Sequence, residues 1–139
     1  MTTSKQKCLF AVNGTVPLLC GLFIYLTKSE NTLVTSAFSS LRAFLPVISY
    51  PVVIRNFACD FLWAYAFFFC LRLSLGDELK GKHNLRIVVI TAVFAVILEL
   101  IQLPLPYLGT FDPWDIVTEL LAVAVAFILT NLIEKNGKR

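Results

Sequence analysis

Apolar residues occur in four long, nearly uncharged runs, each of which is long enough to cross a membrane as a helix. The runs cover residues 8–27, 57–75, 85–103 and 114–133. A helix needs about 20 residues to cross the hydrocarbon core of a bilayer, within a range of roughly 17–25. The pattern therefore predicts an all-α integral membrane bundle of four transmembrane helices, which forms one membrane-embedded domain over residues 1–139.

A fifth apolar stretch, residues 33–54, differs because it contains an arginine, several hydroxyl side chains and two prolines. Apolar residues recur there at positions i, i+4, i+7 and i+11, namely Val34, Phe38, Leu41 and Leu45. Polar residues lie elsewhere around the helix, which is typical of a helix in the plane of the membrane surface. We predict an additional amphipathic interfacial helix between the first and second spans. Whether the segment up to Arg55 is such a surface helix or a lid over a site stays open.

The basic residues set the orientation of the four spans. With the N-terminus in the cytoplasm, nine of the twelve Lys and Arg residues lie on the cytoplasmic side. The three on the outer side are Lys28, Arg42 and Arg55. If residues 33–54 were a fifth span, the basic segment between Arg72 and Arg86 would face outward, against the positive-inside rule. We therefore expect a multi-pass protein of the plasma membrane with both termini in the cytoplasm.

The composition excludes several other classes of protein. Hydrophobic residues make up 58% of the chain and charged residues 15%, whereas a soluble domain carries about 25% charged residues. A soluble monomer of this length would lack the polar residues to cover its surface. The net charge of +3 is spread along the chain rather than gathered on one stripe, so no nucleic acid partner is expected. The expected partner is the lipid bilayer.

Acidic residues gather toward the expected outer side. Glu99 and Gln102 share a face of the third span, because they are three positions apart. A charged group inside a bilayer is costly, and it marks a function or a pairing partner. We predict that acids from three helices face one another across a small polar cleft open to the outside, in which one or more is protonated or paired with a base. The candidate site comprises Asp60, Glu99, Gln102, Asp112, Asp115 and Glu119, with Arg55 as the expected basic partner.

Purely structural roles for some of these residues stay open. Asp112 precedes Pro113 and has the position of a helix N-cap. Asp115 lies in the first turn of the same span, where the helix dipole favours an acid. Glu99 and Glu119 can instead hold the helices together through interhelical hydrogen bonds.

No cofactor or metal is expected. The four cysteines lie in or beside apolar runs without a C-x-x-C pair, and we interpret them as small buried hydrophobic residues. The motifs of soluble enzymes are absent from the sequence, so enzyme activity is not expected.

Three alternative functions stay open. The first is a membrane-embedded, metal-dependent enzyme on a lipid-linked substrate, in which Glu99, Asp115 and Glu119 bind a divalent cation. The others are a small transporter and an assembly subunit. A transporter is disfavoured because, apart from Asn13 and Thr15, no polar residues continue from the acids into the inner half of the helices.

A family resemblance is carried by residues around the third and fourth spans. These are Glu99-Leu-Ile-Gln102, the prolines 104 and 106, Gly109-Thr-Phe-Asp112 and Asp115. Together with Asp60-Phe-Leu-Trp63, this pattern resembles the VanZ-like proteins, which are small multi-span membrane proteins of bacteria. The resemblance covers about half of the chain, from Asp60 to Ala126.

The resemblance implies a role at the cell envelope. The founding members of the family are associated with low-level resistance to the glycopeptide antibiotic teicoplanin. A lipid-linked envelope component or a glycopeptide is therefore the implied partner. Many members carry an Arg in the loop after the Gln, where this chain has Tyr107 and Leu108, so Arg55 is the remaining candidate to pair with the acids. Glu119 and Ala122 also stand where members commonly have Asn and Gly.

Overall fold

A computed structural model describes residues 4–29, 33–75, 83–105 and 111–136. Within these ranges every regular element is a helix. The four long helices are α1 (Ser4–Thr27), α4 (Cys59–Ser74), α5 (His83–Gln102) and α6 (Pro113–Asn136). A π-helical turn, η1 (Ile54–Ala58), runs directly into α4. The all-α class and the four apolar spans predicted from the sequence are confirmed, since four helices are long and apolar enough to cross a membrane.

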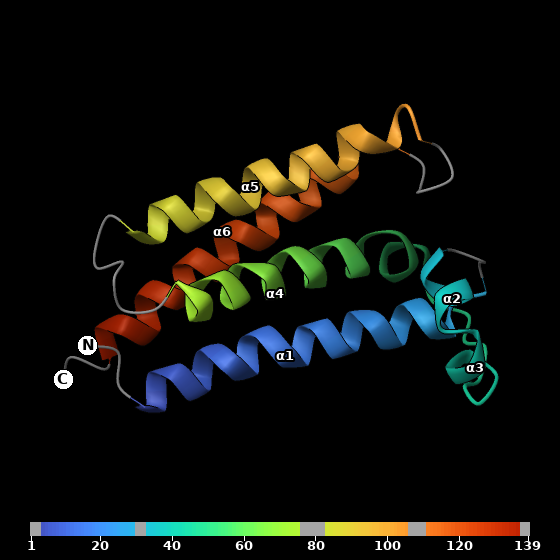
Figure 1. Ribbon diagram of the computed structural model, residues 1–139, viewed down its shortest axis with the longest axis horizontal. Coiled ribbons are helices and arrows are strands. Elements are labelled where there is room, and N and C mark those ends of the chain that lie inside the picture. Colours follow the sequence, from blue (N-terminus) through green and yellow to red (C-terminus); the bar gives the residue numbers. More distant parts are fainter. Residues whose placement is uncertain (1–3, 30–32, 76–82, 106–110, 137–139) are drawn as a thin grey trace.

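The four helices alternate in direction, and both ends of the chain lie at the same end of the bundle (Figure 1). The two central helices, α4 and α6, pack against each other. The first helix, α1, packs mainly on α4, and α5 packs mainly on α6. The last turn of α5 and the first turns of α4 and α6 therefore meet at the end opposite the termini.

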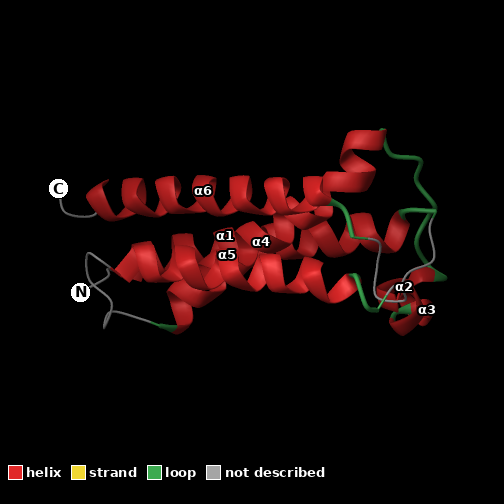
Figure 2. Ribbon diagram, turned by 90° about the horizontal axis from the view of Figure 1, so that it is seen from above, coloured by secondary structure: helices red, strands yellow, loops and turns green. Residues whose placement is uncertain are grey.

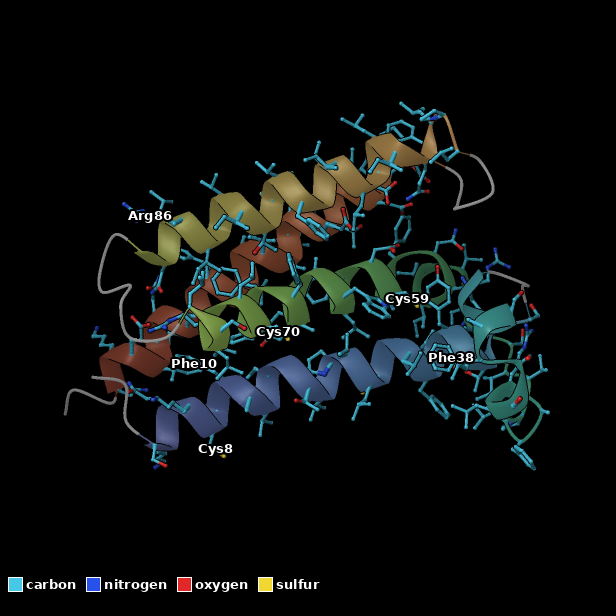
Figure 3. All side chains as sticks on the ribbon, viewed as in Figure 1. Cys8, Phe10, Phe38, Cys59, Cys70 and Arg86 are labelled. Carbon is cyan, nitrogen blue, oxygen red and sulfur yellow. The ribbon has the colours of Figure 1, made fainter. Side chains whose placement is uncertain are left out.

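The core lies between the helices and is built largely from aromatic and small side chains. Its buried members are Phe10, Phe68, Phe69, Ile87, Val123 and Ala126. The ring centroids of Phe10 and Phe69 are 5.9 Å apart, which joins α1 to α4. Figure 3 shows Phe10 between these helices, whereas Cys8 points away from the bundle.

The cysteines do not all match the interpretation as buried residues. Only Cys59 is buried, and the other three, Cys8, Cys20 and Cys70, are exposed on the bundle surface. All three lie at the outer surface of the bundle, where Sγ of Cys70 also borders Gly14 of α1. Small, weakly polar thiols are compatible with such lipid-facing positions.

Two glycines let α1 approach α4 closely. A Cβ atom added to Gly21 would lie 3.2 Å from Nε1 of Trp63, and one added to Gly14 would lie 3.4 Å from Sγ of Cys70. Small residues at such contacts allow transmembrane helices to pack by van der Waals contact. The glycines of α1 therefore define the face that meets α4.

The segment between α1 and α4 is more broken than the sequence predicts. Instead of one amphipathic helix it has two short ones, α2 (Leu33–Ala37) and α3 (Ser39–Arg42), separated by Phe38 at φ −105° and ψ 30°. Irregular chain follows through Pro46 and Pro51. Proline removes a backbone donor and disfavours a helical residue before it, so a continuous helix cannot form there.

This segment folds back onto the end of α1. The backbone N–H of Ile48 donates to the carbonyl of Thr27 at 2.8 Å, and the hydroxyl groups of Thr27 and Tyr50 are 2.7 Å apart. Both short helices consequently lie at the bundle end opposite the termini (Figures 1 and 2). The connecting segment is thus brought to the same end as the acidic residues.

Candidate ligand-binding site

Helices α4, α5 and α6 bring four carboxylates together at this end of the bundle. Asp60 lies in the first turn of α4, Glu99 in the last turn of α5, and Asp115 in the first turn of α6. Glu119 follows one turn deeper in α6. The carboxylate of Asp60 interacts electrostatically with those of Asp115 and Glu99, and that of Glu119 interacts with all three. We call this group of four residues the acidic cluster.

Glu99 is buried, with 5% of its surface exposed. The Gln102 side-chain amide donates to Oε1 of Glu99 at 2.7 Å, and the backbone N–H of Asp112 also donates to this carboxylate. The i, i+3 relation noted in the sequence thus corresponds to a hydrogen bond. Gln102 and Asp112 hold the Glu99 side chain at the end of α5.

Glu119 is the deepest member of the acidic cluster and is 8% exposed. Among the residues that the structure describes, Oε2 of Glu119 and Oε2 of Glu99 are buried and accept no hydrogen bond. A buried acceptor without a donor costs roughly 1–3 kcal/mol, and more when it is charged. Two such oxygens on neighbouring helices can therefore accept hydrogen bonds from a donor outside the described residues.

Exposure increases from the deepest members of the site toward the helix ends. Asp60, Gln102, Asp112 and Asp115 are partly exposed, whereas Glu99 and Glu119 are buried. A ligand that approaches the helix ends would meet the partly exposed residues first and the two glutamates last. This order fits a site that is entered from the end of the bundle.

Asp112 has a structural role as well. Its Oδ1 accepts a hydrogen bond of 2.9 Å from the backbone N–H of Trp114, and its carbonyl accepts one of 3.0 Å from Asp115. These contacts are those of a residue that caps the N-terminus of α6. Asp112 therefore begins the helix that carries Asp115 and Glu119.

The cation beside the cluster is a lysine to which the sequence reasoning assigned no role. Lys28 is 7% exposed and interacts electrostatically with Asp60. Its Nζ atom lies 4.1 Å from the ring centre of Tyr25. The sequence does contain one indication of this role. Lys28 directly follows the first apolar run, which ends at the same end of the bundle as the start of the span that carries Asp60.

Arg55, the basic partner expected from the sequence, has a hydrogen bond elsewhere. Its Nε donates to Oδ1 of the neighbouring Asn56 at 3.2 Å. Pairing of Arg55 with the acids stays a prediction.

Within the described ranges, no three His, Cys, Asp or Glu side chains come together closely enough to hold a metal ion. The four carboxylates of the acidic cluster nevertheless lie near enough to influence one another electrostatically.

Buried hydroxyl groups that the sequence reasoning missed lie farther along the bundle. Thr91 of α5 is 1% exposed and Thr130 of α6 is 0% exposed, and neither Oγ1 has a hydrogen-bond partner among the described residues. The buried face of α5 also carries Asn84. The half of the helices nearer the termini therefore carries more buried polar groups than expected, which weakens the argument raised against a transporter.

The fold and this site define a class, a multi-span helical membrane protein with buried acids at one end of its bundle. No family model, curated protein or solved structure matches the chain. The site itself therefore carries the functional argument.

Proposed function

We propose that the chain is a VanZ-like multi-pass protein of the plasma membrane, whose acidic cluster binds an ammonium group of an envelope molecule at the outer leaflet. The observation that carries the proposal is the pair of buried carboxylate oxygens, Oε2 of Glu99 and Oε2 of Glu119, which lack donors among the described residues. An ammonium group supplies positive charge together with up to three N–H donors. It would satisfy both oxygens at once.

The surroundings of the two glutamates support a positively charged ligand. Asp60 and Asp115 add negative charge beside Glu119. Gln102 already donates a hydrogen bond to Oε1 of Glu99. This bond holds the carboxylate in place and so fixes the direction in which Oε2 points. A quaternary ammonium group offers charge without donors, and would leave the glutamate oxygens unsatisfied.

The proposed orientation places the acidic cluster on the outer side. It follows from the excess of Lys and Arg in the segments at the other end of the bundle. The segment that holds α2 and α3 then lies along the outer membrane surface. Its exposed apolar residues support this location, since Phe44 is 86% and Val47 is 67% exposed.

A direct test compares two amphiphiles of equal charge. We expect the purified protein in detergent to bind dodecylammonium about tenfold more tightly than dodecyltrimethylammonium, because only the first donates hydrogen bonds to the buried carboxylates. In Glu119→Gln the preference should disappear. The matched control is Glu78→Gln, which removes the same charge in the connection between α4 and α5.

Two results would contradict this proposal. One is equal binding of the two amphiphiles to the unchanged protein, and the other is an undiminished preference in Glu119→Gln. The family role is tested separately, by measuring the teicoplanin susceptibility of cells that express the unchanged chain, Glu99→Gln or Asp115→Asn. We expect the unchanged chain to reduce susceptibility and the two variants to lose this effect.

A further inference from the structure

Helices α5 and α6 carry a set of buried polar atoms without hydrogen-bond partners. Among the described residues, five side chains have such an atom, and all five belong to these two helices. They are Asn84, Thr91 and Glu99 of α5, and Glu119 and Thr130 of α6. Buried polar groups that find no protein partner are typically bonded to buried water. The set therefore points to water between α5 and α6.

The two threonines carry this argument, because they differ from other helical threonines of the protein. Thr27 and Thr118 donate their hydroxyl groups to the carbonyl four residues earlier, at 2.7 Å and 2.9 Å. That bond is a common one for a threonine inside a helix. Thr91 and Thr130 are 1% and 0% exposed, yet their Oγ1 atoms have no such bond. Each hydroxyl group is thus available to a water molecule.

These side chains form a line along the bundle. Asn84, Thr91 and Glu99 are seven and eight residues apart, which is about two helical turns each, so they share one face of α5. Thr130 directly precedes Asn131, whose Oδ1 accepts a hydrogen bond of 3.2 Å from the Asn84 amide. Thr130 therefore lies near the Asn84 end of the line, and Glu99 closes the other end. We call Asn84, Thr130 and Thr91 the polar seam.

Small side chains lie between the polar seam and the acidic cluster. The buried residues at these positions include Ala95 of α5 and Ala122 and Ala126 of α6. The aromatic rings of Phe10 and Phe69 instead pack between α1 and α4. Because an alanine side chain ends at Cβ, water has little to displace beside these three residues.

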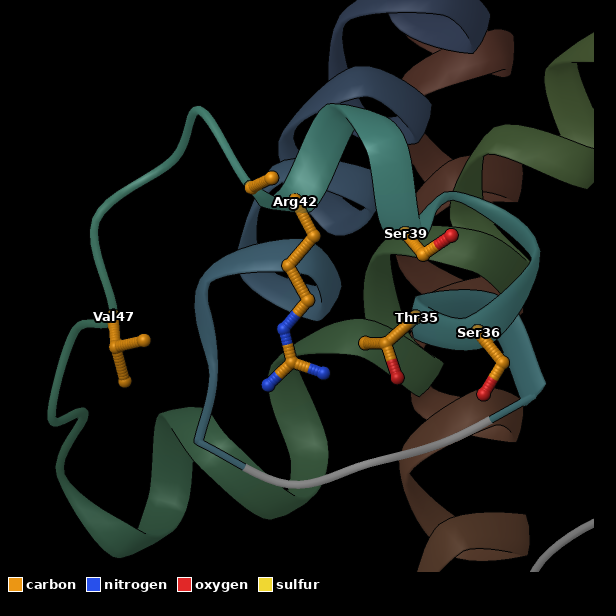
Figure 4. A pocket seen from close by; sticks show the side chains of 6 residues that line it. Thr35, Ser36, Ser39, Arg42 and Val47 are labelled. Carbon is orange, nitrogen blue, oxygen red and sulfur yellow. The ribbon is translucent and has the colours of Figure 1, made fainter.

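The polar groups at the other cavity of the bundle end are different. Arg42 lines a pocket of about 520 Å³ beside α2 and α3 (Figure 4). Its Nη2 atom donates to the carbonyl of Lys28 at 3.1 Å, so it already has a partner within the chain. The polar seam is therefore the stronger indication of a further function.

We propose that water in the polar seam forms a proton path between the acidic cluster and the opposite end of the bundle. A proton from the outer solution binds the carboxylate of Glu119 and passes to the adjacent water, which releases another proton to the next. Each transfer breaks one O–H bond and forms one, so the net result is the movement of one proton without a co-reactant. At the far end, Arg72 and Asn84 donate to the carboxylate of Glu134, and the proton leaves there for the cytoplasm. Chains of buried polar residues are characteristic of proton relays in membranes.

The test is proton uptake by liposomes that contain the purified full chain and a pH-sensitive dye. A potassium gradient with valinomycin makes the interior negative, so that potassium efflux balances the charge of the entering protons. We expect faster acidification than in protein-free liposomes. Thr91→Val combined with Thr130→Val should reduce the protein-dependent rate at least tenfold, because valine keeps the shape of threonine and lacks the hydroxyl group. Thr118→Val is the matched control, since its hydroxyl group bonds within α6.

A second pair of substitutions separates the hydroxyl groups from packing. Thr91→Ser combined with Thr130→Ser keeps both hydroxyl groups, and should retain most of the rate. The valine variant should also keep the preference of the acidic cluster for dodecylammonium, which shows that it is folded and that the two functions are distinct. A rate no higher than that of protein-free liposomes would overturn the proposal. So would equal rates in the unchanged chain and the valine variant, or equal losses in the valine and serine variants.

Discussion

Arg72 is a charged side chain buried between α1, α4 and α6 at the end of the bundle that holds the termini. Its side chain is 7% exposed, and its Nη2 lies 2.8 Å from Oε1 of Glu134. The Asn84 side-chain amide donates to the other oxygen of Glu134 at 3.1 Å. Glu134 thus has two partners inside the bundle, although it lies near the basic end of the fourth apolar run, where the sequence alone indicates nothing beyond contact with water. Sequence position alone cannot show that the last turn of α6 lies against the last turn of α4.

Removing one partner of this pair should be more harmful than replacing both. We expect Glu134→Ala to lower the free energy of unfolding by roughly 3 kcal/mol, because it leaves the Arg72 charge buried without its carboxylate. That value is at the low end of the range for buried pairs, since the Glu134 side chain is 26% exposed. The measurement is equilibrium unfolding in mixed detergent micelles.

The matching double variant is Arg72→Met with Glu134→Leu. We expect it to be more stable than Glu134→Ala, because apolar groups replace both charges. Lys135→Gln changes an exposed charge one residue away and is the control. A double variant less stable than Glu134→Ala would show that the ion pair itself is not the source of the loss.

At the scale of whole helices, the close packing of α1 on α4 depends on glycine. We expect Gly21→Leu to destabilise the bundle by about 1–3 kcal/mol, which is typical of overpacking. The cause is the 3.2 Å distance from an added Cβ to Nε1 of Trp63, with Leu62 immediately behind it. Val16→Leu enlarges a residue on an exposed face of the same helix, and should leave the unfolding transition unchanged. Equal effects of the two substitutions would argue against close packing at Gly21.

The elements were predictable to different degrees. The spans followed from their apolar runs, and the predicted run 57–75 lies within the continuous helical stretch Ile54–Ser74 to within one residue. The break at Phe38 was not predictable from the apolar spacing, because residues on both sides of it keep the period of a helix. The fold-back through Ile48 and Thr27 depends on a backbone hydrogen bond, which leaves no pattern in side-chain types.

The candidate site was partly predictable for a physical reason. Acids are rare in apolar helices, so each one stands out in the sequence. Asp60, Glu99 and Glu119 lie at similar distances from the same end of three predicted spans, which indicated that they belong to one site. The role of Lys28 could not be deduced in the same way. It depends on how the end of α1 lies beside the start of α4, which only the packed bundle shows.

For the whole molecule, the orientation in the membrane is the main remaining prediction. In a cysteine-free background, we expect Ser39→Cys to react with a membrane-impermeant maleimide added to intact cells. Ser74→Cys should react only after the membrane is opened, because the basic segments keep its end of the bundle in the cytoplasm. Both residues are exposed in the fold. Labelling of Ser74→Cys alone in intact cells would reverse the proposed orientation.

The spacing of the two polar ends has a consequence for the surrounding membrane. Twelve residues separate Asp60 from Arg72 along α4, a rise of about 18 Å. The hydrocarbon layer of a typical bilayer is about 30 Å thick. At least one of these two charged side chains therefore lies below the level of the lipid headgroups. Because α4 packs against the other three long helices, we expect those helices, rather than a thinned bilayer, to shield the two charges from lipid.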